Sequence, residues 1–226
     1  MLVTYMSTVH DGSMKYDDQI ASDGQLCARD TFLLNNGIQP SDTTLIYLAY
    51  DGDDYRRYYT LSDSDKGIGV TSPRTLKSDA LVVTNPGHAL FLPLGDCIAA
   101  VIHDPITNIL MLSHLGRHNI EQIGGTAYIQ YLIDRHHVDP THLQIWLSPA
   151  AGSGNYPLHN FENRGLHDVA VEQLAAAGVP VENIEVSPID TTTDLNYYSH
   201  SEFRKGNRST DGRFAVVAYL KCDTTS

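Results

Sequence analysis

The sequence predicts an α+β fold, in which mixed or antiparallel sheets and about three helices form a single-domain sandwich over residues 1–226. Three observations support this prediction. Short apolar runs alternate with Gly, Pro and Asn between residues 79 and 125, as in strands separated by turns. Two of these runs, Ile98–Ile102 and Ile109–Leu112, flank Asp104-Pro105-Ile106-Thr107, which is typical of an antiparallel hairpin. Longer amphipathic segments lie between the strand-like runs.

Each element is expected from its own local pattern. Apolar and β-branched runs predict strands at residues 1–6, 43–50, 80–84, 89–94, 98–102, 109–112, 143–147, 181–186 and 213–220. Apolar residues at helical spacing predict helices at residues 25–36, 119–136 and 160–177. Asn119 and Gln122 indicate an N-cap and its capping-box partner, and Gly37 and Gly178 are stop signals. The charged, tyrosine-rich stretch 51–77 is expected to be a loop or hairpin, with a lid as an alternative.

Composition bounds the function. At 226 residues and 42% hydrophobic, the chain is long enough for one well-buried core. A net charge of −12 and a pI near 5.2 repel phosphate backbones, so we do not expect nucleic-acid binding. Three cysteines at unrelated spacings indicate free thiols and a cytoplasmic location. No apolar run reaches the ~18 residues of a membrane span, and the oligomeric state is left open.

Cys97 and His114 are the predicted centre of the site. Cys97 follows Gly95-Asp96 at the start of one hairpin strand, and His114 lies at the far end of the returning strand. We therefore expect the thiol and the imidazole to face one point, near a helix N-terminus that favours a thiolate or an anion. Cys97 is then a zinc ligand, a nucleophile activated by His114 with Asp96 orienting the imidazole, or a buried core residue.

The order DALVVTN, GDC, HDP and SHLGR resembles the laccase-domain family, also called the multicopper polyphenol oxidase or purine nucleoside phosphorylase family. The 17 residues from Cys97 to His114 resemble the family's spacing between its metal-binding cysteine and second histidine. Weaker matches extend the resemblance over nearly the whole chain: Ser7-Thr8, Asp11-Gly12, Asp190-Thr191, Tyr198-Ser199 and Gly212-Arg213-Phe214.

The resemblance implies a zinc-dependent enzyme that phosphorolyses adenosine, inosine or methylthioadenosine, or deaminates adenosine. It implies zinc bound by Cys97, His114 and an upstream histidine, but here Asp51 stands at that upstream position. Asp51 is therefore the predicted third ligand, with His10, His88 and His118 as rivals and a metal-free site as a further alternative. Copper-dependent oxidation is less expected, because the sequence has no HxH-type histidine pair.

Basic residues are the predicted phosphate ligands. Arg117, Arg204 and Arg208 supply guanidinium groups suited to an anion, and Arg204 and Arg208 belong to a hydroxyl-rich segment at 190–212. His118 and His200 stand where the family has arginines and are expected to line the same pocket. The predicted partner is a small molecule, a purine nucleoside with phosphate. The alternatives are a metal-free Cys/His hydrolase or amidase and a degenerate, non-catalytic binding protein.

Overall fold

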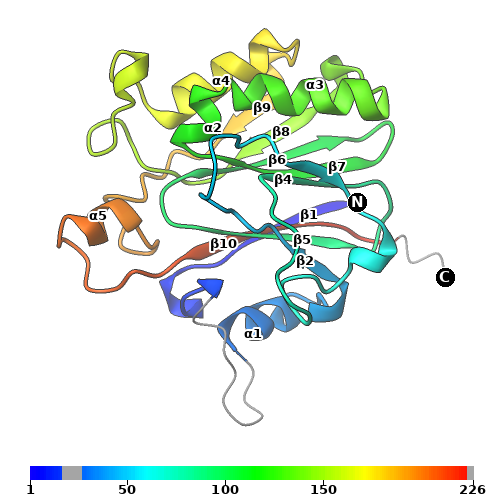
Figure 1. Ribbon diagram of the computed structural model, residues 1–226, viewed down its shortest axis with the longest axis horizontal. Coiled ribbons are helices and arrows are strands. Elements are labelled where there is room, and N and C mark those ends of the chain that lie inside the picture. Colours follow the sequence, from blue (N-terminus) through cyan, green and yellow to red (C-terminus); the bar gives the residue numbers. More distant parts are fainter. Residues whose placement is uncertain (17–26, 223–226) are drawn as a thin grey trace.

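The computed structural model describes residues 1–16 and 27–222. These residues form two stacked β-sheets with helices on both outer faces, so that four layers follow one another (Figure 1). The α+β class predicted from the sequence is confirmed. Within the described residues, no helix is long and apolar enough to span a membrane.

The larger sheet contains the central hairpin. Its six strands lie in the order β3-β4-β7-β6-β8-β9. Their bounds are β3 Tyr58–Thr60, β4 Ala80–Val83, β7 Ile109–Leu115, β6 Ile98–Asp104, β8 Gln144–Leu147 and β9 Ile184–Val186. The β6–β7 pairing is antiparallel, as the turn at Asp104-Pro105 predicted, whereas the short β3 and β9 are parallel to their neighbours.

The smaller sheet brings the two ends of the chain together. Its order is β1-β10-β5-β2, with β1 at Leu2–Met6, β10 at Phe214–Leu220, β5 at Ala89–Leu94 and β2 at Thr43–Leu45. β10 is antiparallel to both β1 and β5, and β2 is parallel to β5. The strand expected at residues 43–50 therefore ends at Leu45, and beyond it only an isolated bridge joins Tyr47 to Lys77.

The alternation of side chains along the strands divides the interior into three apolar cores. The first lies under the helices α3 (Gly124–His136) and α4 (Leu166–Ala176), where Ile98, Ala100 and Ile102 of β6 point outward from the sandwich. The intervening Ala99 and Val101 enter the second core, between the two sheets. The third core lies between the smaller sheet and α1 (Ala28–Asn35). This stacking fixes the facing surfaces of the two sheets.

The helix predicted at residues 119–136 is in fact two helices. α2 covers Arg117–Glu121, and Ile123, in the left-handed conformation at φ 59°, separates it from α3. Asn119 is not the N-cap: it is the third helical residue, and its Oδ1 accepts a hydrogen bond from the Gly116 N–H at 3.3 Å. The Gln122 side chain contacts the backbone of residues 53–55 instead of capping a helix.

Three other element boundaries differ from the prediction. α4 begins at Leu166 and not at residue 160, because Glu162 and Asn163 adopt positive φ values and form a turn. The segment 181–186 is a strand only from Ile184 onward. Residues 25 and 26 of the first predicted helix lie outside the described residues. A fifth helix, α5 at His200–Arg204, lies in the segment 190–212.

Candidate functional site

The β6–β7 hairpin brings Cys97 and His114 to one point. Ala99 of β6 pairs with His114 of β7, so Cys97, just before β6, lies beside Gly116, just after β7. The Sγ of Cys97 and the Nε2 of His114 each lie 2.9 Å from the position that a Cβ on Gly116 would take. The two atoms are therefore separated by at most twice that distance. Both residues line one cavity of about 640 Å³.

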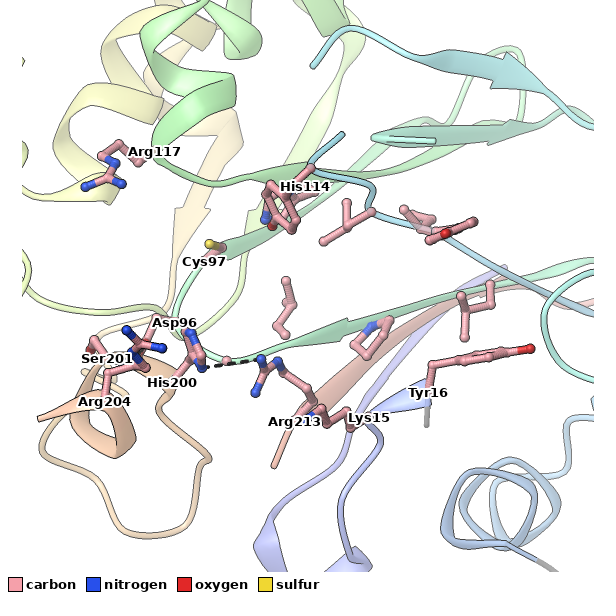
Figure 2. A pocket seen from close by; sticks show the side chains of 18 of the residues that line it. Lys15, Tyr16, Asp96, Cys97, His114, Arg117, His200, Ser201, Arg204 and Arg213 are labelled. Atoms are coloured by element: carbon pink, nitrogen blue, oxygen red, sulfur yellow. Dashed lines mark hydrogen bonds between the residues drawn. The ribbon is translucent and has the colours of Figure 1, made fainter. Parts of the chain in front are cut away.

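This cavity lies between the facing ends of the two sheets. Figure 2 shows Cys97, His114 and Arg117 along one wall, and His200, Arg204 and Arg213 along the wall that faces them. The first wall belongs to the β6–β7 hairpin and α2. The second belongs to α5 and to the residue just before β10. The cavity is thus formed by elements that are far apart in the sequence.

Burial keeps both central groups neutral near pH 7. It raises the pKa of the Cys97 thiol to about 12, and the Asp96 charge acts in the same direction; Arg213, Arg117 and the Arg117 backbone N–H oppose it. Burial also lowers the pKa of His114 to about 4, against the opposing charge of Asp79. His114 is 3% exposed, and its Nδ1 has no hydrogen-bond partner among the described residues. The structure therefore pairs a thiol with a neutral imidazole.

Asp96 lines the cavity but does not orient His114 as expected. Its Oδ1 accepts hydrogen bonds from Thr191 Oγ1 at 3.0 Å and Ser199 Oγ at 2.7 Å, and its Oδ2 accepts from the Ser201 N–H at 2.6 Å. This carboxylate is 6% exposed. It therefore ties the turn before β6 to the segment that carries α5.

Asp51, the predicted third metal ligand, does not line the cavity with Cys97 and His114. Its carboxylate is more than half exposed and forms ion pairs with Lys77 and Arg57. Among the described residues, no group of three or more His, Cys, Asp or Glu side chains is arranged to hold a metal ion. The donor set supplies two of the three protein ligands that a catalytic zinc site needs, so it does not fit zinc.

The rival histidines do not complete a site either. His10 belongs to a short surface turn. Nε2 of His88 lies 2.7 Å from Thr44 Oγ1 within the protein interior. His118 stacks on Tyr55 with ring centroids 4.9 Å apart. None of the three lines the cavity, so the expectation that His118 would face it is not met.

The other predicted anion ligands divide into two groups. Arg117, His200 and Arg204 line the cavity. Arg208 does not, because its guanidinium donates to the backbone carbonyl oxygens of Thr192 and Asp194, at 3.3 Å each. Arg208 therefore holds its own loop together.

Asp211 fixes the basic wall opposite Cys97. Its carboxylate lies 2.7 Å from Arg213 Nη1, 2.8 Å from His200 Nδ1 and 3.0 Å from Lys15 Nζ. All three of these residues line the cavity. One carboxylate thus positions three nitrogen-bearing side chains that come from separate parts of the sequence.

Several cavity residues were not predicted: Lys15, Tyr16, Tyr50, Arg74, Tyr156 and Arg213. Arg213 lies in the Gly212-Arg213-Phe214 motif of the resemblance, and Tyr50 directly precedes Asp51, so the sequence motifs could have indicated both. No motif in the sequence indicated Lys15 or Arg74. The Arg74 guanidinium lies between the Tyr16 and Tyr47 rings, 3.9 and 4.0 Å from their centroids.

The comparisons with known proteins agree with this architecture. Residues 57–164 match the family model described as multi-copper polyphenol oxidoreductase laccase. The fold is similar to that of YlmD from Geobacillus stearothermophilus, with a TM-score of 0.81 and 19% identity over 98% of this chain and 92% of that one. The fold is also similar to that of the Bacillus licheniformis hypothetical protein YfiH, with a TM-score of 0.79 and 17% identity over 97% of this chain and 93% of that one.

A Neisseria meningitidis protein of family DUF152 has a TM-score of 0.66 and 14% identity, over 98% of this chain and 95% of that one. No match was found among curated proteins. At these identities the solved structures establish the shared α+β fold alone. The family-model match over residues 57–164, together with this shared fold, supports the resemblance to the laccase-domain family that the motifs predicted.

Proposed function

We propose that this chain is an enzyme that phosphorolyses a purine nucleoside in the cavity lined by Cys97 and His114. One observation carries the proposal. In a chain of net charge −12, the guanidinium groups of Arg117 and Arg204 line this cavity with no acceptor among the described residues. A guanidinium fork matches the geometry of phosphate oxygens. Unpaired forks in an acidic protein therefore favour an anionic co-substrate.

In this reaction a phosphate oxygen bonds to C1′ of the ribose while the C1′–N9 bond breaks. The bonding electrons leave with the purine, which takes up the proton that the hydrogen phosphate gives up, and the products are ribose 1-phosphate and the free base. Arg117 and Arg204 hold the phosphate and offset its charge as it approaches C1′. His114, neutral at pH 7, hydrogen-bonds the substrate at the reacting centre beside Cys97.

Aromatic side chains support the choice of a purine. Tyr50 and Tyr156 line the cavity; burial raises the pKa of both phenols and Cys97 acts in the same direction, so they stand near Cys97. Flat rings beside the site favour stacking with a base. Adenosine, inosine and methylthioadenosine are the first substrates to test, because the family resemblance implies them.

A turnover assay tests the proposal. Purified protein is incubated with each nucleoside, with and without phosphate, and the free base is separated by chromatography. We expect base release that requires phosphate and that falls at least ~10-fold in Arg117→Gln, whereas Arg135→Gln, on the exposed surface of α3, keeps wild-type activity. No base release under either condition, with or without added zinc, would overturn the proposal.

Zinc content and adenosine deamination can be measured on the same purified protein. Deamination of adenosine would require a zinc-activated water, and Cys97 and His114 are only two of the three protein ligands that a catalytic zinc needs. Because the described side chains provide no third ligand, the proposed mechanism uses no metal. Elemental analysis of the purified protein and the formation of inosine from adenosine measure these two properties directly.

A second candidate, a metal-free Cys/His hydrolase or amidase, is favoured by the proximity of the thiol to an imidazole. The backbone N–H of Arg117, at the start of α2, acts to lower the pKa of Cys97, and the neutral imidazole of His114 beside the thiol is the residue that would serve as its base. Such an enzyme would need no phosphate and would resist chelators. The three unpaired cysteines support a reducing, cytoplasmic location under either candidate.

A further inference from the structure

We infer that the cavity contains a second anion-binding position, at Arg74, and that the substrate therefore carries a phosphate of its own. The preferred substrate class is then a nucleoside monophosphate and not a neutral nucleoside. This inference rests on the proposed function, because it assigns the inorganic phosphate to Arg117 and Arg204 and the substrate's phosphate to Arg74.

The geometry of Arg74 leaves its hydrogen-bond donors available. Its guanidinium is held between the rings of Tyr16 and Tyr47, 3.9 and 4.0 Å from their centroids. A cation–π contact places the guanidinium over the ring faces without using an oxygen acceptor for its N–H donors. Those donors have no acceptor among the described residues, although Arg74 lines the cavity. The two rings therefore hold the Arg74 guanidinium in place, while its N–H donors have no protein acceptor among the described residues.

Unpartnered arginines are concentrated at this cavity. Within the described residues, the guanidinium groups of six arginines bind acidic side chains or backbone carbonyls: Arg29, Arg56, Arg57, Arg164, Arg208 and Arg213. The four without such partners are Arg74, Arg117, Arg135 and Arg204. All of these except Arg135 line the same cavity. Three guanidinium groups without a protein acceptor among the described residues are more than one phosphate requires.

The three arginines are also divided between the two ends of the cavity. In Figure 2, Tyr16, on which Arg74 stacks, lies at the end opposite Arg117 and Arg204. The reacting pair, Cys97 and His114, lies between these ends. The cavity volume of about 640 Å³ is within the usual range for a small-molecule site. An elongated ligand with an anionic group at the Arg74 end and its reacting centre near Cys97 fits this arrangement.

Calorimetry with adenosine and adenosine 5′-monophosphate tests the inference independently of turnover. For the wild-type protein, we expect the monophosphate to bind at least ~10-fold more tightly than adenosine, as a charge-assisted bidentate contact would produce. Arg74→Gln is expected to remove this preference while leaving adenosine affinity unchanged. Arg117→Gln is expected to keep the preference, because the inorganic phosphate occupies that position.

Arg135→Gln is the matched control, since it removes an equally unpartnered arginine outside the cavity. If Arg74→Gln does not fold, Arg74→Lys gives the same test, because it keeps the charge but loses the bidentate fork, and we expect it to lose most of the preference. Equal wild-type affinities for the two ligands, or a loss of preference in Arg117→Gln alone, would overturn the inference. Nucleoside phosphorolysis without that preference would refute this inference only, whereas no nucleoside turnover at all would refute the proposed function.

Discussion

The protonation of Cys97 decides how the thiol reacts. Because burial raises its pKa to about 12, the thiolate fraction near neutral pH is very small. We predict that iodoacetamide alkylates the exposed Cys222 faster than Cys97 at pH 7, and that the Cys97 rate rises steadily with pH up to at least 10. Peptide mass spectrometry of the alkylated protein measures both rates. Faster alkylation of Cys97 than of Cys222 would contradict this and favour the hydrolase.

Arg117 supplies the sharpest single-residue test of phosphate binding. Hydrogen bonds to charged groups contribute about 1.5–3 kcal/mol, which corresponds to roughly 10- to 150-fold in affinity. We predict that Arg117→Gln raises the KM for phosphate by at least ~10-fold and changes the KM for the nucleoside much less. Initial rates over a range of phosphate concentrations give both values. An unchanged phosphate KM would place the phosphate elsewhere in the cavity.

Residue patterns were sufficient to predict that Cys97 and His114 lie close together, because the turn at Asp104-Pro105 pairs β6 with β7. Residue patterns did not predict that the side chains of Asp51, Arg208 and His118 lie outside the cavity. Those three side chains form local contacts with an ion pair, loop carbonyls and an aromatic ring, respectively. A motif gives the position of a residue in the chain, but the partner that satisfies its side chain depends on the folded surroundings.

At the scale of elements, the end of β7 sets the spacing of the reacting pair. A Cβ at Gly116 would stand 2.7 Å from His114 Cε1 and 2.9 Å from Cys97 Sγ, closer than side chains tolerate. We predict that Gly116→Ala displaces one of them, lowers turnover at least ~10-fold and destabilises the fold by about 1–3 kcal/mol. Gly154→Ala is the control, because a Cβ there meets nothing within 4 Å.

Enzyme assays and thermal unfolding of the two glycine variants, measured side by side, check this prediction. Wild-type turnover in Gly116→Ala would show that the reaction does not depend on the approach of Cys97 to His114.

Asp96 joins the turn before β6 to the segment that carries α5, and stability measurements test this structural role. In Asp96→Asn, one acceptor oxygen and the negative charge are lost, so the three charge-assisted hydrogen bonds to this buried side chain are weakened. We predict a loss of about 1–3 kcal/mol in stability and faster hydrogen exchange in residues 199–204. Exchange measured by mass spectrometry checks the location. Unchanged exchange there would show that α5 is held by other contacts.

Element boundaries were predicted well where turn chemistry is strong and poorly where backbone conformation overrides propensity. The strands at 80–94 and 98–115 are bounded by Asn-Pro-Gly and Asp-Pro turns that permit few alternatives. The helix at 119–136 was predicted as continuous because isoleucine, the residue at position 123, is not a helix breaker. Its left-handed conformation, at φ 59°, is one that β-branched residues rarely adopt, so the identity of the residue does not predict it.

The topology of the whole molecule brings together the basic residues on the cavity wall opposite Cys97, namely Lys15, His200 and Arg213. Lys15 and Arg213 are almost 200 residues apart, yet both bind Asp211, because β1 and β10 are neighbouring strands. No local pattern predicts such a contact, and this is why Lys15 and Arg74 were missed. The two sheets and their three cores place these residues opposite the Cys97 wall.

Asp211 links this wall to the stability of the fold at low pH. Burial alone would raise its pKa, but hydrogen bonds from Arg213, His200 and Lys15 outweigh burial and hold the pKa well below its usual range. A depressed carboxylate pKa stabilises the fold above the unfolded value of about 3.9, and this contribution is lost as the pH falls further. We predict that Asp211→Asn flattens the loss of stability between pH 5 and pH 2.

Denaturant unfolding across this pH range compares the two proteins. Equal slopes for the wild type and Asp211→Asn would show that the carboxylate does not contribute through its pKa.

The central claim is that this cavity joins inorganic phosphate to the ribose of a purine nucleoside. Phosphorus NMR of the protein with inosine and phosphate tests it most directly, because it follows the phosphorus atom itself. The account predicts that the inorganic phosphate signal decreases as a sugar 1-phosphate signal grows in step with free base, and that this conversion is much slower in Arg117→Gln. Base release without consumption of phosphate, or no conversion at all, would contradict it.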